Sequence, residues 1–307
     1  MSTVPKRLGF VGVGTMGTPM AEHLLGAGFD VAVHDIAPAR VLALATRGAK
    51  VLPSPAAVAR ESDSVICMLP MPHDTERVVF GADGLVHGLR PGSTVIDMST
   101  NSPAFARRAF TQLTARGFDF LEAPVSLGEK GARSGTLTIM AAGAPATFER
   151  HRSVFQAMAA QIYFLEAVGS AQLAKLVSNF VSIVAIGSVA EALVLGTKGG
   201  VRPDQMYDIL ANSIADSRVL RNIGPRILAG DFSPTFALEL AFKDLDLALE
   251  CGREYGVPLP LTAACRELFG FARAAGRGDL DCRAVITALE DVCGVTVRSR
   301  PDGEGAR

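Results

Sequence analysis

The first half of the chain alternates short apolar runs with stretches of helical periodicity. The runs at residues 8–14 (LGFVGVG) and 31–35 (VAVHD) are typical of buried strands, and helical patterns follow at residues 18–28 and 38–48. Further strand-like runs lie at residues 64–70, 93–99, 118–125, 136–143 and 161–166. This alternation predicts a parallel sheet that is covered by helices on both faces.

The pattern changes near Gly169. From there to about Cys293 the chain has helical periodicity, interrupted by glycine and proline. We therefore expect two domains, an α/β domain at residues 1–168 and an all-helical domain at residues 169–299. The polar, glycine-rich end at residues 300–307 is expected to be disordered.

The most apolar long stretch, Leu173 to Leu195, has the length of a membrane-spanning helix. It also carries Lys175, Asn179 and Glu191, together with several serines. Charged and amide side chains are costly inside a bilayer. A helix buried between domains or subunits therefore fits better, and we expect no membrane association.

Composition and charge narrow the function classes. Of the 307 residues, 49% are hydrophobic and 20% are charged, and the net charge is -1, as in soluble globular proteins. This balance gives no general electrostatic basis for binding nucleic acid or an anionic membrane. Five cysteines without a C-x-x-C pair and five scattered histidines indicate reduced thiols and no metal site. A strand that begins at Arg7 leaves no room for a signal peptide, which predicts a cytoplasmic protein.

A glycine-rich loop follows the first predicted strand and precedes a predicted helix. Within GFVGVGTMG, three glycines have the G-x-G-x-x-G spacing. Gly12 would permit the tight turn, Gly14 the approach of a pyrophosphate, and Gly17 close packing of the helix, whose N-terminus would hold the phosphates. This context predicts a Rossmann-type dinucleotide-binding domain, and a turn needed only for packing is the alternative. The residues assigned to the cofactor are Gly12, Val13, Gly14, Thr15, Met16 and Gly17.

The second predicted strand ends at His34-Asp35, and Asp35 lies 23 residues after Gly12. An acid at this position accepts hydrogen bonds from the adenine ribose and repels a 2′-phosphate, so NAD is favoured over NADP. Asp35 could instead only cap the turn before Pro38. Arg40 is close enough in sequence to keep NADP possible.

Two further strand ends, Leu69-Pro70 and Ser99-Thr100, should lie at the same edge of the sheet as the glycine loop. Ligands bind at the carboxyl ends of parallel strands, which makes both segments candidates for cofactor contact. Ordinary transitions from strand to loop would explain them equally well.

Lys175 stands near the start of the long apolar helix, and Asn179 follows one turn later on the same face. Ser170 is expected to be the N-cap of this helix. Partial burial would lower the pKa of the lysine from about 10.4 toward the working pH. Such a lysine could protonate a carbonyl oxygen as hydride arrives, with Asn179 orienting it or binding the substrate. A snorkelling or ion-paired lysine is the alternative.

Two other segments carry polar residues of interest. The connection between two predicted strands contains Ser126 and Gly128, and its backbone N–H groups could bind a small carboxylate. A flexible connector is the alternative there. In the second domain, FALELAFKDLDLALE puts Lys243 on a helix, followed by Asp244 and Asp246, and a solvated charge run is the default interpretation.

Four segments, in this order, resemble motifs of the β-hydroxyacid dehydrogenase family. GFVGVGTMG resembles its cofactor loop, EAPVSLGEKGARSG its substrate motif, GSAQLAKLVSN its catalytic motif and FKDLDLAL a second cofactor-side motif. The family includes 3-hydroxyisobutyrate dehydrogenase, tartronate semialdehyde reductase and, more distantly, 6-phosphogluconate dehydrogenase. The resemblance covers residues 7–295. It implies a Rossmann-type domain followed by an all-α domain like the C-terminal domain of 6-phosphogluconate dehydrogenase.

The resemblance implies a role for each matched residue. Lys175 would be the catalytic lysine and Asn179 its substrate-binding neighbour. Ser126, Leu127 and Gly128 would hold the substrate carboxylate, and Lys243 would line a cleft between the domains near the nicotinamide. The resemblance also implies dimers or tetramers formed through the helical domain. Further cofactor contacts would come from Leu69, Pro70, Asp74, Thr100 and Asp246.

The chain departs from the family pattern at several positions. Leu127 replaces a glycine, and its side chain could narrow the pocket or move the anion-binding backbone. Glu122 replaces an aspartate, and Ala171 replaces a glycine of the lysine motif. The sequence His34-Asp35-Ile36 resembles the members that use NAD.

Together these features predict that NAD reversibly oxidises a small 3-hydroxy carboxylate to its semialdehyde or keto acid, with Lys175 as general acid/base. An imine reductase shares the fold but commonly has an acid or a tyrosine at the lysine position. A non-catalytic dinucleotide-binding module is the alternative from another class. Retention of Lys175 and Asn179 disfavours both.

Overall fold

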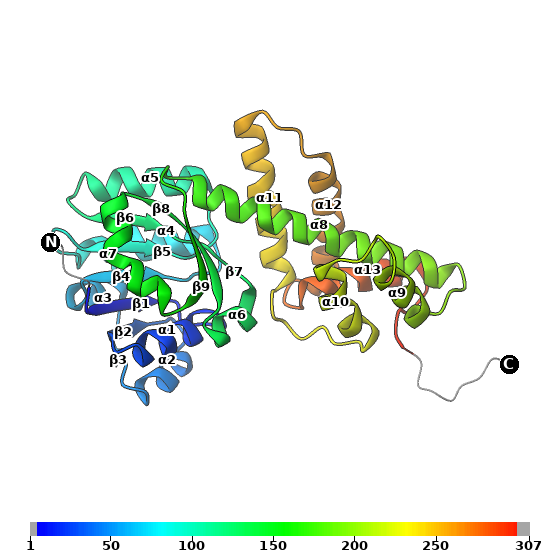
Figure 1. Ribbon diagram of the computed structural model, residues 1–307, viewed down its shortest axis with the longest axis horizontal. Helices are drawn as coiled ribbons and strands as arrows, with labels where there is room; N and C mark the ends of the chain where they lie inside the picture. The colour runs from blue at the N-terminus through cyan, green and yellow to red at the C-terminus, as the bar shows by residue number, and fades with distance from the viewer. Residues whose placement is uncertain (1–4, 300–307) are drawn as a thin grey trace. The chain divides into compact units, whose positions relative to one another are not determined.

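A computed structural model describes residues 5–299, and the chain divides into two compact units, Met1–Leu176 and Val177–Arg307 (Figure 1). The division falls inside the longest helix, α8 (Ser170–Lys198). The last strand ends at Phe164, so strands give way to helices where the sequence pattern changes. The domain boundary at residue 168 stays a prediction. The tail predicted to be disordered, residues 300–307, lies outside the described residues.

In the described part of the first unit, nine strands form a sheet of order β3-β2-β1-β4-β5-β6-β8-β7, with β9 paired to β8. The short strand β3 was not predicted from the sequence, and the predicted run at residues 118–125 forms two strands. The strands are β1 (Arg7–Val11), β2 (Asp30–His34), β3 (Lys50–Val51), β4 (Ser64–Cys67), β5 (Thr94–Asp97), β6 (Asp119–Glu122), β7 (Val125–Ser126), β8 (Leu137–Gly143) and β9 (Ala159–Phe164).

The six strands β1 to β6 pair in parallel, which confirms the predicted parallel sheet for this part of the chain. The remaining edge differs, because β8 runs antiparallel to β6 and β7 and parallel to β9. Only residues 127–136 separate β7 from β8. Parallel neighbours need a crossover of about a dozen residues or more, so this connection favours an antiparallel return.

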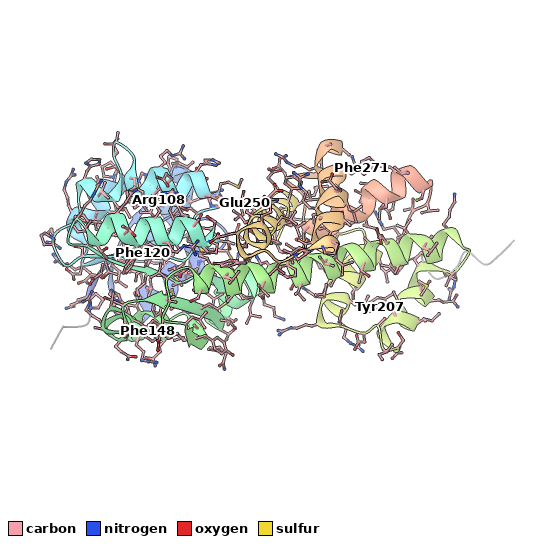
Figure 2. All side chains as sticks on the ribbon, turned by 90° about the horizontal axis from the view of Figure 1, so that it is seen from above. Arg108, Phe120, Phe148, Tyr207, Glu250 and Phe271 are labelled. Atoms are coloured by element: carbon pink, nitrogen blue, oxygen red, sulfur yellow. The ribbon has the colours of Figure 1, made fainter. Side chains whose placement is uncertain are left out.

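Alternate residues of the parallel strands pack into separate cores on the two faces of the sheet. Phe10 lies in one core and its neighbour Val11 in the other. Phe120 on β6 and Phe148 on α7, both labelled in Figure 2, belong to opposite faces and are 1% and 2% exposed. Burying one such side chain contributes about 1.5–3 kcal/mol. One face is covered by α1 (Gly17–Gly26), α2 (Pro38–Ala45) and α7 (Pro145–Gln156), and the other by α3 (Pro55–Glu61), α4 (Pro72–Phe80) and α5 (Pro103–Thr114).

The local sequence explains where these helices begin. Proline occupies the start of α2, α3, α4, α5 and α7, where its missing N–H removes no helical hydrogen bond. Ser102 Oγ accepts a hydrogen bond from Phe105 N at 3.1 Å and caps α5. As a result, α4 and α5 start within a few residues of the carboxyl ends of β4 and β5, and the loops at this edge of the sheet are short.

The second unit consists of helices in its described part, as predicted. Its core gathers Leu238, Leu245, Phe269 and Val285, among others. Besides most of α8, its described α-helices are α9 (Pro203–Ala211), α10 (Arg218–Leu228), α11 (Leu238–Tyr255), α12 (Pro260–Ala272) and α13 (Val285–Cys293). Two short helices of other types lie at Arg273–Arg277 and Cys282–Ala284.

Helix α8 is long and apolar enough to cross a membrane by length and composition, and 33% of its most apolar stretch is buried. Val181 and Leu195 are 58% and 75% exposed. The helix was predicted to be buried between domains or subunits. In a single chain that burial is incomplete, which leaves much of its apolar surface uncovered.

All five cysteines lie among the described residues as free thiols, as their spacing predicts. Four of them are buried, and Cys293 at the end of α13 is partly exposed. Burial raises the pKa of the Cys265 thiol to about 12 and also raises the pKa of Cys67 and Cys282. These buried thiols are therefore protonated and unreactive at neutral pH.

Candidate functional site

The cofactor loop, residues 12–17, joins β1 to α1, and packing requires two of its glycines. Gly12 has a φ of +91°, and a Cβ there would lie 2.3 Å from the carbonyl oxygen of Met68. A Cβ at Gly17 would lie 2.0 Å from the carbonyl oxygen of Gly12, so α1 could not pack as closely against the loop. The backbone thus forms a cradle that side chains would fill, and it fits a dinucleotide pyrophosphate.

Asp35 follows β2 and closes against this loop. One of its carboxylate oxygens accepts a hydrogen bond from Val13 N at 2.9 Å, and the other accepts one from Ala37 N at 2.8 Å. The guanidinium of Arg40 lies 3.8 Å from the carboxylate, and its side chain is 57% exposed. Asp35 therefore caps the turn before Pro38, as one interpretation of the sequence proposed. It also places a carboxylate beside the cofactor loop.

The ends of β4 and β5 are joined by hydrogen bonds at the same edge of the sheet. Leu69 N donates to Ser99 Oγ at 2.9 Å. The buried carboxylate of Asp97 accepts hydrogen bonds from Ser99 N at 3.1 Å and from Asn101 Nδ2 at 2.7 Å. The structure thus brings together two segments that the sequence predicted on one edge, and Thr100 follows there, partly exposed.

The other predicted cofactor residues of this unit lie at the start of α4. Asp74 is in the first turn of that helix and pairs with Arg77 at 2.8 Å. Pro70 is exposed in the loop just before it. Their contact with a cofactor stays a prediction.

Helix α8 begins against the end of β6. Glu122 is completely buried, and its two carboxylate oxygens accept hydrogen bonds from the backbone N–H groups of Gly169 and Gln172. Ser170 was predicted to cap this helix, and that prediction was wrong. It is the first helical residue, and its hydroxyl donates to the carbonyl oxygens of Leu165 and Ala167. The carboxylate of Glu122 satisfies the free N–H groups instead, and no hydroxyl cap is needed.

Lys175 lies five residues into α8 and is 8% exposed. One turn before it, the side chain of Gln172 accepts a hydrogen bond from Asn101 N and donates one to Ser99 O, each at 2.9 Å. These two contacts bind the first turn of α8 to the residues that follow β5. A simple snorkelling lysine would not be buried in this way.

The loop that was predicted to hold the substrate, called the substrate loop below, spans residues 127–136 between β7 and β8. Its middle is not an irregular connector, because residues from Gly128 to Ser134 form helix α6. Leu127 precedes this helix with φ +82° and ψ +8°, a left-handed conformation that glycine adopts without strain. Its side chain is 42% exposed. The leucine therefore keeps a glycine-type backbone and adds a side chain beside Ser126 and Gly128.

In the second unit, Asn179 on α8 meets the start of α11. Asn179 Nδ2 donates to the carboxylate of Asp244 at 2.5 Å, and Lys243 Nζ lies 3.1 Å from the other oxygen of the same carboxylate. Lys243 and Asp244 are 9% and 1% exposed. The solvated charge run expected from the sequence is therefore wrong for these two residues, which join two of the predicted motifs.

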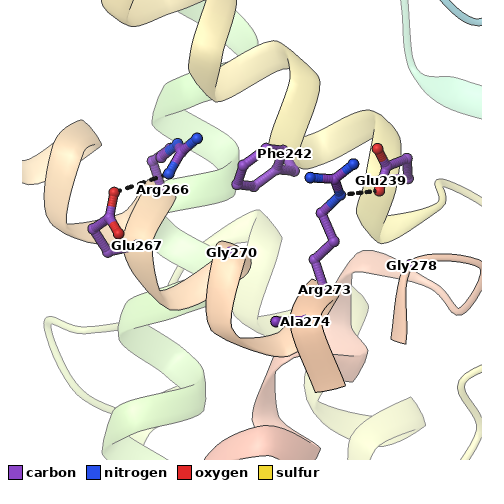
Figure 3. Close-up of a pocket in the computed structure, with 8 residues that line it drawn as sticks. All are labelled: Glu239, Phe242, Arg266, Glu267, Gly270, Arg273, Ala274 and Gly278. Atoms are coloured by element: carbon purple, nitrogen blue, oxygen red, sulfur yellow. Dashed lines mark hydrogen bonds and ion pairs between the residues drawn. The ribbon is translucent and has the colours of Figure 1, made fainter. Parts of the chain in front are cut away.

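A hollow of about 630 Å³ lies elsewhere on the second unit, and its lining includes none of the predicted site residues (Figure 3). The ring of Phe242 has the guanidinium groups of Arg266 and Arg273 over it, 4.4 and 4.9 Å from its centroid. Arg266 also donates to Asp246 at 2.8 Å. Asp246 is thus engaged within the helical unit, and its contact with a cofactor stays a prediction.

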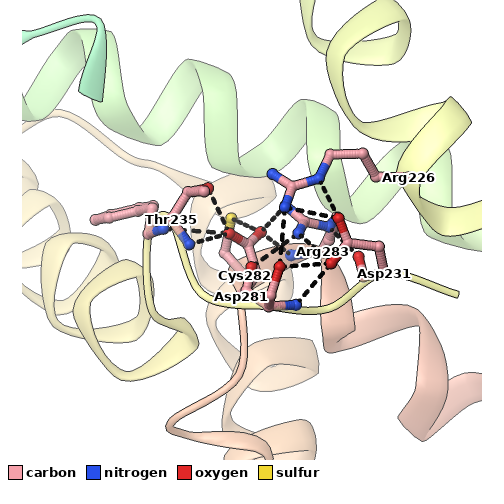
Figure 4. A network of polar contacts seen from close by, with 8 residues as sticks. Arg226, Asp231, Thr235, Asp281, Cys282 and Arg283 are labelled. Atoms are coloured by element: carbon pink, nitrogen blue, oxygen red, sulfur yellow. Dashed lines mark hydrogen bonds and ion pairs between the residues drawn. The ribbon is translucent and has the colours of Figure 1, made fainter. Parts of the chain in front are cut away.

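A buried ion pair fastens the segment that precedes α11 (Figure 4). Arg283 Nη1 lies 2.7 Å from Asp281 Oδ1, and the two side chains are 3% and 2% exposed. Asp281 also accepts hydrogen bonds from Thr235 N at 2.8 Å and Thr235 Oγ1 at 2.7 Å. Removing one partner of a buried pair is strongly destabilising. The network therefore stabilises the segment just before α11, the helix that carries Lys243.

Sequence reasoning missed the supporting roles of Glu122, Gln172 and Asp244. Each lies inside a segment that the motifs had marked, but none stood out by residue type. An acid at the end of an apolar strand was the one available signal for Glu122. The partners of Gln172 and Asp244 lie 71 and 65 residues away along the chain, beyond any local pattern.

Two family models match the chain. The first, described as the NAD binding domain of 6-phosphogluconate dehydrogenase, matches residues 7–169. The second, described as NAD-binding of NADP-dependent 3-hydroxyisobutyrate dehydrogenase, matches residues 169–289. The glycine cradle and these matches together identify an NAD(P)-binding chain.

Curated relatives match over nearly the whole length. The chain is 38% identical to 2-(hydroxymethyl)glutarate dehydrogenase of Eubacterium barkeri, over 95% of this chain and 97% of that protein. The chain belongs to the β-hydroxyacid dehydrogenase family. This family member is also 38% identical to 2-hydroxy-3-oxopropionate reductase of Escherichia coli (strain K12), over 92% of this chain and 97% of that protein. The family membership and the oxidoreductase class predicted from the four motifs are thereby confirmed.

Solved structures agree with this assignment. A 3-hydroxyisobutyrate dehydrogenase from Salmonella typhimurium superposes on this β-hydroxyacid dehydrogenase with a TM-score of 0.85 at 32% identity, covering 92% of this chain and 99% of that one. An imine reductase from Pseudomonas sp. superposes with a TM-score of 0.60 at 22% identity, covering 92% of this chain and 99% of that one. At that identity the second likeness shows a shared fold alone.

Proposed function

We propose that this β-hydroxyacid dehydrogenase interconverts a small 3-hydroxy carboxylate, of the 3-hydroxyisobutyrate type, with its semialdehyde or keto acid. The observation that carries the proposal is the placement of Lys175. It is 8% exposed and lies one turn after Gln172, which is bonded to Ser99 and Asn101 where β5 ends. A buried lysine fixed near the cofactor edge of the sheet suits a general acid/base.

Each residue of the proposed site has a separate task. NAD(P), when bound, supplies or accepts the hydride. Lys175 would donate a proton to the carbonyl oxygen during reduction and take it back during oxidation. Ser126 and Gly128 would hold the substrate carboxylate. Asn179, whose amide is oriented by Asp244 at 2.5 Å, would bind the substrate beside the lysine.

The preference for NAD is part of this proposal and rests on Asp35. Its carboxylate lies against the cofactor loop, where a negative charge disfavours a 2′-phosphate. The exposed guanidinium of Arg40, at 3.8 Å, offsets part of that charge and keeps some activity with NADP. We expect NAD to be the better cofactor and NADP to remain usable.

We further propose a homo-oligomer, a dimer or tetramer, in the cytoplasm. The apolar side chains of α8, such as Val181 at 58% and Leu195 at 75% exposure, support a subunit interface along this helix. The relatives' names add support for the substrate class. One of them is an L-threonate dehydrogenase of Cupriavidus necator, 36% identical over 92% of this chain and 95% of that protein.

The test is the absorbance of the reduced nicotinamide with purified protein. The screen takes 3-hydroxyisobutyrate, glycerate, threonate, 3-hydroxypropionate and 4-hydroxybutyrate, each with NAD and with NADP. Lys175→Ala is expected to lower kcat by about 10²-fold or more, while dinucleotide binding remains. Lys175→Arg, which keeps the cation but cannot release its proton near neutral pH, is the matched control and should be equally impaired.

Two results would contradict the proposal. Full activity of Lys175→Ala would remove the lysine from the chemistry. Tight dinucleotide binding without turnover of any hydroxy acid would favour an imine substrate or a non-catalytic binding module.

A further inference from the structure

The carboxylate of Glu122 makes an unusual cap for the helix that carries Lys175. It comes from the end of β6, not from the helix itself, and it reaches two N–H groups of the first turn, those of Gly169 and Gln172. A carboxylate at a helix N-terminus is favoured by the free N–H groups and by the helix dipole. Because Glu122 is completely buried, these contacts are shielded from water.

Gln172 continues this contact to the ends of two other strands. Its own N–H donates to Glu122 at 2.9 Å, while its side chain is bonded to Ser99 O and Asn101 N. Ser99 Oγ in turn accepts from Leu69 N at 2.9 Å. One unbroken set of hydrogen bonds therefore runs from the end of β4, through the end of β5, to the first turn of α8.

We propose that Glu122 and Gln172 are positioning residues, which fix the place of Lys175 relative to the cofactor edge of the sheet. Lys175 follows Gln172 by three residues, so a shift or rotation of this turn moves the lysine directly. Glu122 sets the distance between the first turn of α8 and the end of β6. Gln172 sets the rotation of this turn about the helix axis. The inference rests on the proposed role of Lys175 as general acid/base.

The surroundings of Glu122 act on its pKa in opposite directions. Burial, together with the carboxylate of Asp97, raises its pKa, whereas the hydrogen bonds from Gly169, Ala171 and Gln172 lower it, and the outcome is a pKa of about 7. The N–H groups of Gly169 and Gln172 are thus directed at one buried carboxyl, with the N–H of Ala171 nearby. A glutamine in its place would point an NH₂ group at one of them, so the first turn would have to move.

The test compares Glu122→Gln, Glu122→Asp and Gln172→Met with the unchanged protein. Gln172→Met keeps the size of the side chain and removes both of its hydrogen bonds. We expect Gln172→Met and Glu122→Gln to lower kcat by about 10- to 100-fold, because a displacement of about 1 Å has this effect on a positioned group. Dinucleotide Kd should stay unchanged. Glu122→Asp keeps two acceptor oxygens, so its kcat should be much closer to that of the unchanged protein than the kcat of Glu122→Gln is.

The decisive readout is the primary kinetic isotope effect with substrate deuterated at the carbon that bears the hydroxyl. A misplaced lysine makes the chemical step slower, so the isotope effect on kcat should rise in Gln172→Met and Glu122→Gln. His151→Gln is the matched control. His151 is equally buried in the same unit but bonds to Ser64 at the opposite, amino end of β4, at 2.7 Å. It should lower stability without changing the isotope effect.

Three outcomes separate the possibilities. Unchanged kcat and isotope effect in both variants, with Lys175→Ala inactive, would overturn this inference and leave the proposed function intact. In the second outcome, kcat falls only in proportion to the fraction of protein that no longer binds dinucleotide, and the isotope effect is unchanged. This would also overturn the inference and indicate a purely structural role. Full activity of Lys175→Ala would overturn the proposed function itself.

Discussion

The cofactor loop and the substrate loop both depend on glycine-type backbone, but for different physical reasons. In the cofactor loop, a Cβ at Gly12 or Gly17 would lie 2.3 or 2.0 Å from a backbone oxygen. In the substrate loop, Gly128 has a φ of +57°, yet a Cβ there would meet nothing within 4 Å. Next to it, Leu127 holds a side chain at φ +82°. Packing therefore constrains Gly12 and Gly17, whereas backbone conformation alone constrains Gly128.

This difference indicates which loop can change during divergence. A glycine enclosed by backbone atoms has no substitute that leaves its neighbours in place. A position constrained only by a positive φ can accept a side chain at a cost of about 1–2 kcal/mol. The start of the substrate loop can therefore accept side chains that the cofactor loop cannot, and Leu127 is one of them.

The largest expected effect is that of Gly17→Ala in the cofactor loop. The new Cβ would overlap the carbonyl oxygen of Gly12, so α1 must move away from the loop. We expect a loss of about 3 kcal/mol or more in the free energy of unfolding and a clear loss of dinucleotide affinity. Denaturant unfolding and a dinucleotide titration measure both. Gly128→Ala is the matched control, and equal effects in the two variants would mean that packing does not distinguish the two positions.

A second effect concerns buried Glu122, which ends β6, the strand before β7 and the substrate loop. By contrast, β1, which leads into the cofactor loop, ends on apolar Val11. The pKa of Glu122 is raised from 4.5 to about 7, and burial is the main cause. The folded protein therefore binds this proton more tightly than the unfolded chain does. Its stabilising effect is complete below about pH 4.5 and is lost as the pH rises to 7, by up to about 3 kcal/mol.

The measurement is the unfolding free energy of the unchanged protein minus that of Glu122→Gln, between pH 4 and 8. This difference should fall as the pH rises, and a flat difference would contradict the assignment. The subtraction is needed because His151 acts in the opposite sense. Burial lowers its pKa from 6.5 to about 4, so its contribution to stability grows as the pH rises between these values.

A smaller effect is expected at Leu127. Leu127→Gly removes the side chain and the strain of its left-handed backbone, and should raise the free energy of unfolding by up to about 1 kcal/mol. Leu127→Ala is the matched variant, because it removes most of the bulk and keeps the strain. If the side chain borders the substrate, both variants should change the ratio of kcat/KM between bulky and small 3-hydroxy acids by about 10-fold or more. An unchanged ratio in both would exclude Leu127 from substrate selection.

The smallest effect should come from Arg40→Ala beside the cofactor loop. This removes an exposed cation 3.8 Å from Asp35, and such pairs contribute about 0–1 kcal/mol. We expect the ratio of kcat/KM for NAD over NADP to rise by a few fold, with little change in stability. Parallel assays with the two cofactors measure it. A fall in the ratio would mean that Arg40 does not assist a 2′-phosphate.

Local sterics explain why the cofactor end could be predicted from the sequence. The spacing of Gly12, Gly14 and Gly17 after an apolar strand indicates a tight turn from strand to helix, and residues close in sequence determine that turn. The strand ends at Leu69 and Ser99 followed from a general property of parallel sheets. These inferences needed no knowledge of distant contacts.

Contacts over long sequence separations explain what could not be predicted. Asp244 looked like one member of a charge run, but its carboxylate meets Asn179 from a different helix. Ser170 has the residue type of an N-cap, yet a carboxylate from β6 takes that place. In both cases tertiary packing overrides a local preference, and residue type alone does not show it.

The distribution of the cysteines gives the protein a natural attachment point for a probe. Cys293 ends α13 and is partly exposed, and its carbonyl oxygen accepts a hydrogen bond from Lys198 Nζ at 2.8 Å. The other four thiols are buried. A maleimide dye should therefore couple to one site of the folded protein without prior removal of any cysteine, and fluorescence could then follow the helical unit during turnover.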